Sequence, residues 1–261
     1  MTDAPPWAGG ASGAYATCVL APNPGPMTLD GTNTWVLRAD PGAPALVVDP
    51  GPLDDGHLAR VRAAAGDVAV VLLTHGHVDH AEGARAFADA VRCGVRALDP
   101  RHRLGDEGLG DGDVVVVGDL DVRVVATPGH TSDSLSFVLP DRSVLTGDTV
   151  LGRGTTVVAH PDGELGAYLA SLRRLRDLAE HAEVVRVLPG HGPVVEGARA
   201  VLDGYLAHRA ERLDQVRAAV AAGDTTPRAV VERVYAHVDP VLWPAAELSV
   251  AAQLAFLRTG R

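Results

Sequence analysis

Short apolar runs alternate with turns rich in glycine and proline along the chain up to about residue 195. Apolar runs of about four to eight residues bounded by turn residues are typical of β-strands. Between them, residues 81–91 and 164–179 have helical spacing; the second stretch carries apolar side chains at three- and four-residue intervals, which predicts an amphipathic helix. We therefore expect an α/β domain with strands at 34–38, 45–49, 68–73, 95–98, 114–117, 122–126, 134–139, 143–146 and 184–188.

Near residue 195 the strand-like runs give way to helical spacing. The predicted helices cover about 196–221, 226–238 and 245–258. Thr226 followed by Pro227 fits a helix N-cap with a proline in the first turn. The change in pattern predicts two domains, an α/β body at residues 1–195 and a small helical domain at residues 196–261.

The charged residues narrow the range of functions. The formal net charge is −10, and all 23 basic residues are arginine. Without lysine, Schiff-base catalysis and phosphate binding by a P-loop are excluded. The acidic balance also disfavours long-range attraction of polyanions, so a nucleic-acid substrate would need a local patch of arginine.

The sequence also bears on the compartment of the protein. Its first residues, MTDAPPWAGG, lack the basic start and apolar core of a secretory signal. No run approaches about 18 consecutive apolar residues, the length that a membrane span requires. Cys18 and Cys93 are far apart and show no pairing pattern. We expect a cytoplasmic protein that spans no membrane.

The densest group of chemically active side chains follows the predicted strand at 68–73. Within LLTHGHVDH, residues 72–80, the chain places three histidines and an aspartate in six positions. Adjacent imidazoles cannot satisfy one another at neutral pH, and imidazole and carboxylate are common ligands of transition metals. The stretch therefore predicts metal binding by His75, His77, Asp79 and His80.

Three more candidate ligands stand in equivalent places. Each follows a predicted strand and a short turn that contains glycine, which lets the backbone approach an ion closely. These residues are His130, Asp148 and His191. Four strand ends that all carry ligand side chains predict one metal centre at an edge of the sheets.

The order of these residues resembles the metallo-β-lactamase superfamily, whose motif is HxHxDH followed by histidine, aspartate and histidine. The resemblance implies an αββα sandwich that holds two metals and uses a metal-bridging hydroxide as nucleophile. It implies His75, His77 and His130 as ligands of the first metal and Asp79, His80 and His191 as ligands of the second, with Asp148 bridging both. It also implies that Asp79 orients the hydroxide. Two Zn²⁺ ions are expected, with iron or manganese as alternatives.

Longer segments are similar to the β-lactamase-like protein 2 group of that superfamily. They are residues 22–37, 127–139, 145–158, 189–195 and 205–216. The resemblance implies a winged-helix-like C-terminal domain, here with the wing reduced or absent because the chain stops at FLRTGR. Members include an endoribonuclease acting on single-stranded RNA, whereas related members are thioesterases acting on polyketide chains. A thioesterase of the polyketide, acyl or glyoxalase-II type is therefore the alternative to the endoribonuclease.

Two segments are candidates for substrate contact. Arg153 and Thr155 lie in the loop after Asp148 and offer donors to a substrate. On the predicted helix at 196–221, Tyr205, His208 and Arg212 are spaced to share one face. That face either looks into the active-site cleft or is simply solvated. The expected substrate is a small ester or thioester, or single-stranded RNA.

Overall fold

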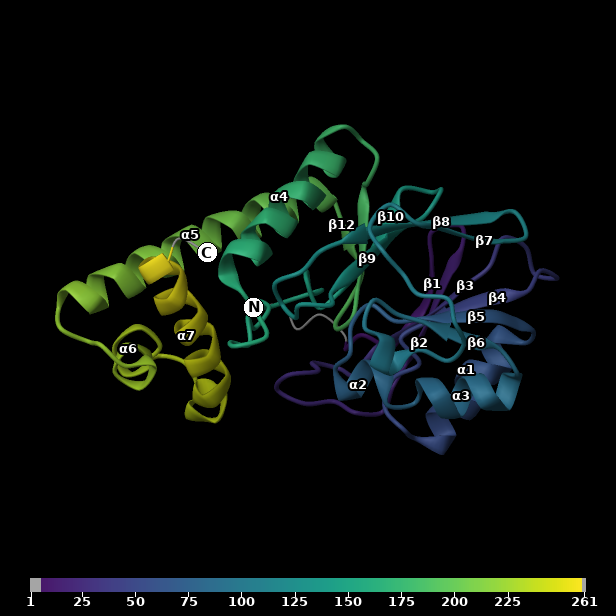
Figure 1. Ribbon diagram of the computed structural model, residues 1–261, viewed down its shortest axis with the longest axis horizontal. Helices are drawn as coiled ribbons and strands as arrows, with labels where there is room; N and C mark the ends of the chain where they lie inside the picture. The colour runs from purple at the N-terminus through teal and green to yellow at the C-terminus, as the bar shows by residue number, and fades with distance from the viewer. Residues whose placement is uncertain (1–5, 260–261) are drawn as a thin grey trace.

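Two six-stranded mixed sheets form the body of the protein in the computed structural model, which describes residues 6–259 (Figure 1). The first sheet contains, in spatial order, β1 (Gly10–Ser12), β2 (Ala16–Leu20), β3 (Asn33–Leu37), β4 (Ala45–Val48), β5 (Val68–Leu72) and β6 (Gly94–Arg96). The second contains β12 (Val195–Glu196), β11 (Arg186–Pro189), β10 (Ser143–Gly147), β9 (Leu135–Val138), β8 (Leu120–Ala126) and β7 (Val114–Val117).

Strand direction brings several strand ends to one edge of the body. Strands β4, β5 and β6 are parallel to one another, as are β10 and β11. The other pairs are antiparallel. Parallel strands present their carboxyl ends together, which places the segments that follow β5, β10 and β11 within reach of one another.

The main core lies between the two sheets. Trp35 and Leu72 of the first sheet share one cluster of buried side chains with Phe137 and Leu188 of the second. Strand β7 shows the expected alternation: Val115 is buried in this cluster, whereas Val116 is 61% exposed.

Helices cover the outer face of each sheet. On the first sheet these are α1 (Asp55–Ala65), α2 (Val78–Ala81) and α3 (Ala84–Val91), and on the second sheet α4 (Leu165–Glu180). Val61 and Phe87 pack on the first sheet, and the apolar stripe of α4 packs on the second. The stripe predicted from the sequence is buried along its whole length, at Leu165, Tyr168, Leu169, Leu172 and Leu175. The predicted αββα sandwich is confirmed.

A helical domain follows, made of α5 (Ala198–Ala221), α6 (Pro227–Val234), the short 3-10 helix η2 (Pro240–Leu242) and α7 (Trp243–Thr259). Its core contains Val216, Val230 and Val250. Helix α5 runs beside α4 and joins this domain to the body (Figure 1). From α5 to residue 259 the structure describes helices and turns without a strand that would form a wing.

The stretch Pro240–Thr259 is long and apolar enough to cross a membrane by length and composition, with a mean hydropathy of 1.3. The sequence pattern did not indicate a membrane span here, because polar residues interrupt the apolar ones. In the structure, Val250, Ala252 and Leu254 of this stretch are buried against the neighbouring helices. Packing therefore explains part of its apolar composition, since 28% of its most apolar 18 residues are buried.

Some elements differ from the prediction. Strands β1, β2 and β12 are additional, and the helix expected at 81–91 begins only at Ala84, as α3, after the separate turn of α2 that ends at Ala81. Strand β1 reads GAS and β12 contains two residues, so neither carries the apolar run that indicates a strand. Pairing with β2 and β11 fixes them instead.

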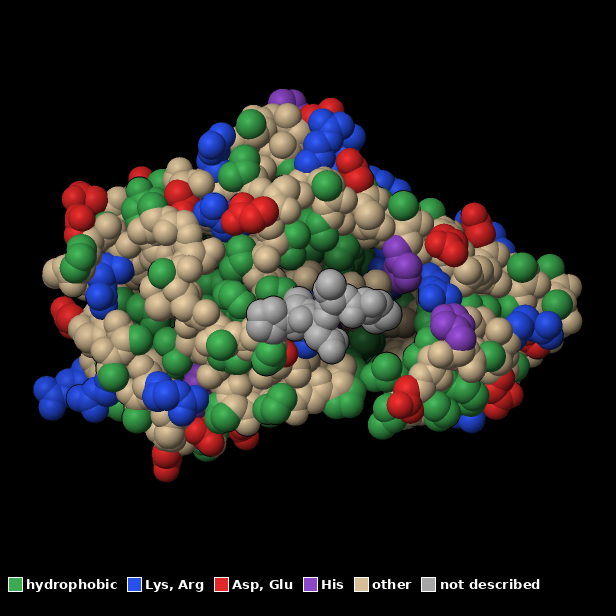
Figure 2. All heavy atoms as spheres, turned by 180° about the vertical axis from the view of Figure 1, so that it is seen from behind, with side chains coloured by type: hydrophobic (Ala, Val, Ile, Leu, Met, Phe, Trp, Pro, Cys, Tyr) green, Lys and Arg blue, Asp and Glu red, His purple; other side chains and the backbone are tan. Residues whose placement is uncertain are grey.

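The surface mixes charge types. Figure 2 shows acidic and basic side chains interspersed with apolar ones over the face of the molecule turned toward the viewer. Many of the arginines are paired with acids, as Arg123 is with Glu183 and Arg228 with Glu232. This face therefore presents no continuous basic band.

Candidate metal centre

Four strand ends place the seven predicted ligands at one edge of the sandwich. The segments that follow β5, β8, β10 and β11 carry them. Two glycines make the close approach possible. A Cβ atom on Gly147 would lie 2.6 Å from the Thr74 hydroxyl, and one on Gly190 would lie 2.5 Å from Asp148 Oδ1. A larger residue at either position would push the strand ends apart.

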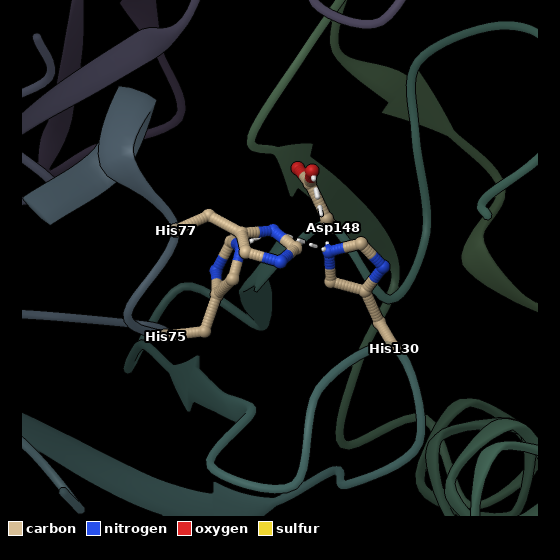
Figure 3. Close-up of side chains that lie close together, drawn as sticks. All are labelled: His75, His77, His130 and Asp148. Carbon is tan, nitrogen blue, oxygen red and sulfur yellow. Dashed lines mark hydrogen bonds and ion pairs between the residues drawn. The ribbon is translucent and has the colours of Figure 1, made fainter. Parts of the chain in front are cut away.

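The first group of ligands converges on one point. His75, His77, His130 and Asp148 each offer an atom within 4.8 Å of the others, and Figure 3 shows the four side chains pointing toward one another. His77 Nδ1 lies 3.0 Å from His75 Nε2 and 3.1 Å from His130 Nε2. His75 and His130 are almost fully buried, whereas His77 is partly exposed.

The second group lies beside the first. Asp79, His80 and His191 bring their ligand atoms within 4.8 Å of one another. His191 Nε2 lies 3.1 Å from Asp79 Oδ2 and 3.2 Å from His80 Nε2. The carboxylate of Asp148 stands between the groups, with Oδ1 3.5 Å from His80 Nε2 and Oδ2 3.7 Å from His130 Nε2.

The far side of each buried imidazole is held by the protein. A carboxylate or carbonyl oxygen accepts from Nδ1 of His80, His130 and His191, and the Thr74 hydroxyl accepts from Nδ1 of His75 because its own proton goes to Asp49. Each Nδ1 therefore donates to the protein, and Nε2 is the nitrogen that each of these rings turns toward the centre, where it can bind a metal once it is deprotonated. Ring nitrogens of different histidines therefore stand 3.0 to 3.2 Å apart around the centre, a concentration of imidazole that suits a shared cation.

Asp148 provides an independent sign that the donor set suits a metal. Its Oδ1 atom is buried and has no hydrogen-bond partner among residues 6–259. A buried, unpartnered carboxylate oxygen is costly unless a cation completes its environment. Both donor groups, rich in imidazole nitrogen and completed by carboxylate oxygen, fit divalent transition metals.

Burial and the neighbouring charged groups shift the pKa values of the candidate ligands. Burial and the neighbouring imidazoles lower the pKa of His75 well below 6.5. Although burial acts in the opposite direction, His191 and His80 hold the pKa of Asp148 well below its usual value. Against the effect of burial, Asp148 raises the pKa of His191 to about 9. A cation entering this group therefore displaces a proton from His191.

Asp49 is a functional residue that the sequence reasoning did not identify. It is 1% exposed, and its Oδ2 accepts from His80 Nδ1 at 2.8 Å and from the Thr74 hydroxyl at 2.6 Å. Its Oδ1 accepts from the backbone N–H of Thr74 at 2.8 Å. It thus orients His80 directly and also holds the end of β5 that carries His75, His77 and Asp79. The only signal in the sequence is an aspartate directly after the strand that ends at Val48.

A cavity of about 350 Å³ opens beside the centre. His130 and Asp148 line one end, the loop at 153–157 lines another part, and the helical domain closes the remainder. Most of the other lining side chains are apolar: Pro26, Met27, Leu29, Leu151, Val157, Val238, Leu242, Ala245 and Ala246. The cavity therefore joins the metal centre to the interface between the two domains.

Four of the five predicted substrate contacts line this cavity, namely Arg153, Thr155, His208 and Arg212. Tyr205 does not. It is 6% exposed, packs in the cluster beneath α4, and its hydroxyl accepts from the backbone N–H of Leu151 at 2.9 Å. In the structure Tyr205 therefore supports the loop after Asp148 from behind.

A two-sheet sandwich with this donor set at its edge defines a metal-dependent hydrolase. The chain belongs to the metallo-beta-lactamase superfamily, whose family model matches residues 27–191. Residues 226–259 match the beta-lactamase associated winged helix domain.

Individual proteins extend this result. The chain is 34% identical to a beta-lactamase-like protein 2 homolog of Caenorhabditis elegans over 209 residues, which cover 75% of this chain and 68% of that one. It is 35% identical to the atrochrysone carboxyl ACP thioesterase of Aspergillus fumigatus over 209 residues, 76% of this chain and 62% of that one. It thus spans less than two thirds of the thioesterase.

A solved structure shows the same fold. The beta-lactamase domain protein from Burkholderia ambifaria superposes with a TM-score of 0.81 at 24% identity, covering 99% of this chain and 91% of that one. The similarity therefore extends through the helical domain as well as the sandwich.

Proposed function

We propose that the protein is a dinuclear zinc hydrolase that cleaves the thioester of a small acyl group. The observation that carries this proposal is the cavity of about 350 Å³, whose lining surface is more apolar than polar and which reaches Asp148 and His130. Such a volume suits a small molecule enclosed on several sides. It favours the thioesterase, which the sequence offered as the alternative, over the endoribonuclease, which the sequence placed first.

Two metal ions are supported by the two donor groups, since Asp148 belongs to the first and also lies 3.5 Å from His80 and 3.4 Å from His191 of the second. Zinc is supported by the five imidazoles, since zinc binds nitrogen ligands in compact tetrahedral sites. A zinc pair supplies, when bound, a Lewis acid for the carbonyl oxygen and a water of lowered pKa. Metal analysis of the purified protein distinguishes zinc from iron and manganese.

Asp79 is the proposed catalytic carboxylate. Its side chain is 29% exposed, so it faces the open side of the centre. Burial raises the pKa of Asp79, but the His80 and His191 side chains outweigh this effect and lower it to about 2. The carboxylate is therefore ionised at neutral pH and acts by accepting a hydrogen bond from the attacking water and orienting it.

The apolar wall binds the acyl chain. Leu29, Leu151 and Val157 stand near the metal end, and Leu242 and Ala246 come from the helical domain. An acyl chain in this position removes apolar surface from water, which is worth about 25 cal/mol for each Å² buried. The thiol then leaves through the open side, because a carrier or nucleotide attached to it exceeds the cavity.

Cleavage of single-stranded RNA is the second candidate. Arginines 153, 209 and 212 all line the cavity, and guanidinium groups bind phosphate well. Against it stand the net charge of −10 and the interspersed charges of the face in Figure 2. A groove that follows several phosphates requires a longer basic surface.

One experiment ranks the two activities. Zinc-loaded protein is incubated separately with acyl thioesters and with single-stranded RNA, and Asp79→Ala serves as the control for contaminating activity. We expect thiol release from the thioester, intact RNA, and no turnover by the variant. Cleaved RNA beside an intact thioester contradicts the proposal.

A further inference from the structure

The cavity contains a buried cation whose charge no side chain neutralises. Arg209, on α5, is 7% exposed and lines the cavity. Its Nη2 donates to the carbonyl of Thr156, and its guanidinium lies 4.9 Å from the centre of the Tyr168 ring. Its Nε is buried without a hydrogen-bond partner, and no carboxylate within residues 6–259 lies within 4.0 Å of its nitrogens.

The other arginines nearby are placed differently. Arg153, in the same cavity, is paired with Asp30, and Arg217, two turns further along α5, is paired with Asp214 at 2.7 Å. Arg212 is half-buried, donates to Gln215 at 2.8 Å and stacks over Tyr235. Arg209 is thus more buried than these three and less neutralised than the two paired ones.

Burial of an unpaired guanidinium is unfavourable, because the group loses its hydration without gaining an anion. A bound anion restores the balance. The planar guanidinium suits a carboxylate, whose two oxygens accept parallel hydrogen bonds. The volume of about 350 Å³ limits the anion to part of a small molecule.

The position of Arg209 fixes which end of the substrate it contacts. Thr156 links it to the metal centre: the Thr156 carbonyl accepts from Arg209, and the Thr156 hydroxyl donates to the backbone carbonyl of Asp148 at 2.8 Å. A single residue therefore separates the cation from a metal ligand. A substrate whose carbonyl lies at the metals reaches Arg209 with a short chain.

We propose that Arg209 binds a carboxylate on the acyl group, so that the substrate is a thioester of a short dicarboxylic acid. This inference rests on the proposed thioesterase function. Hydrolysis breaks the C–S bond, joins the oxygen of water to the carbonyl carbon and gives a proton to the departing thiolate. The products are the free dicarboxylate and the thiol.

A structural role for Arg209 predicts a different outcome. If the side chain only supports Thr156 and Tyr168, its loss lowers stability and turnover for every substrate alike. If it binds a carboxylate, its loss penalises only substrates that carry one. The comparison of charged and uncharged acyl groups separates the two roles.

The substrates are thioesters of N-acetylcysteamine, an uncharged thiol, with acyl chains that end in a carboxylate or in a methyl group at equal length. Since hydrogen bonds to charged groups are the strong ones, we expect wild type to prefer the carboxylate by about 10- to 100-fold in kcat/KM at the best chain length. Arg209→Gln removes this preference, and Arg209→Lys retains part of it. Arg217→Gln, on the same helix, behaves as wild type.

Equal kcat/KM values for both series in wild type overturn the proposal, as does a preference that survives in Arg209→Gln. Calorimetry provides a readout without turnover: wild type binds a dicarboxylate more tightly than its monoamide, and equal affinity overturns the inference. If this difference holds while no thioester is hydrolysed, the proposed function fails and the anion site stands. The calorimetric comparison also applies should Arg209→Gln not fold.

Discussion

Replacing Asp49 by asparagine tests whether the residue behind His80 controls the second donor group. Asp49 Oδ2 accepts from His80 Nδ1 at 2.8 Å, which keeps the proton on Nδ1 and the lone pair on Nε2. An asparagine that keeps its oxygen toward the Thr74 N–H turns its NH₂ toward His80. Nδ1 must then accept, and the proton moves to Nε2, where it blocks coordination.

The opposite orientation of the amide is also unfavourable. In wild type the backbone N–H of Thr74 donates to Asp49 Oδ1 at 2.8 Å. In this orientation of the asparagine the NH₂ group would face that N–H, so two buried donors would oppose each other. An unsatisfied buried donor costs about 1–3 kcal/mol. Either way, we expect Asp49→Asn to weaken metal binding by about 10- to 100-fold, the usual effect of losing a partner behind a ligand.

The assay is a competition for zinc between the protein and a chromogenic chelator, with the number of bound ions measured in parallel. Asp141→Asn is the matched control, because the Asp141 carboxylate, like that of Asp49, accepts hydrogen bonds from the backbone, here from Ala14 and Ser143, but lies at the opposite end of β10. We expect Asp49→Asn to lose affinity at one of two sites and Asp141→Asn to lose none. Two sites of wild-type affinity in Asp49→Asn refute the argument.

Three further outcomes are expected. His75→Ala loses metal and activity because it removes a ligand of the first group, and full metal content measured by atomic spectroscopy contradicts the ligand assignment. Arg212→Ala keeps its metal but has a raised KM, because Arg212 lines the substrate cavity. Unchanged kinetics would mean that this face of α5 contacts only solvent. Burial and then Arg60 lower the pKa of His57 to about 4. Because this value lies below that of the unfolded chain, the metal-free protein is stabilised above pH of about 6.5 and loses at most about 3 kcal/mol as the pH falls toward 4. Urea unfolding at both pH values checks this, and His57→Gln flattens the difference.

The sequence predicted the layers of the fold well because apolar periodicity reports burial directly. The stripe of α4 and the strands β4, β5, β7 and β10 fall close to where the pattern placed them. The seven candidate ligands come together because each lies in a segment that follows a strand, and the strand order brings these segments to one edge. Whether they hold two metals stays a prediction. Asp49 was missed because its role arises from contacts with residues 25 and 31 positions away.

Tyr205 and Arg209 both lie on the buried face of α5, which differs from the prediction for Tyr205. The spacing in the sequence predicted that Tyr205, His208 and Arg212 share one face of the helix. The structure groups Tyr205 with the buried stripe of the helix, which contains Leu202, Tyr205, Arg209, Leu213 and Val216. These positions repeat at intervals of three and four, as the buried face of a helix does.

Arg209 is the one charged member of that buried stripe. An arginine in an apolar stripe is rarely buried unless something pairs with it. Within the residues that the structure describes, no acid does so, and the cavity beside it leads to the metal ligands. The periodicity of α5 therefore already held a signal of ligand binding, because a charge that breaks an apolar pattern must be compensated from somewhere. We infer that this compensation comes from a substrate, so that the same helix that packs the two domains together also selects what reaches the candidate metal centre.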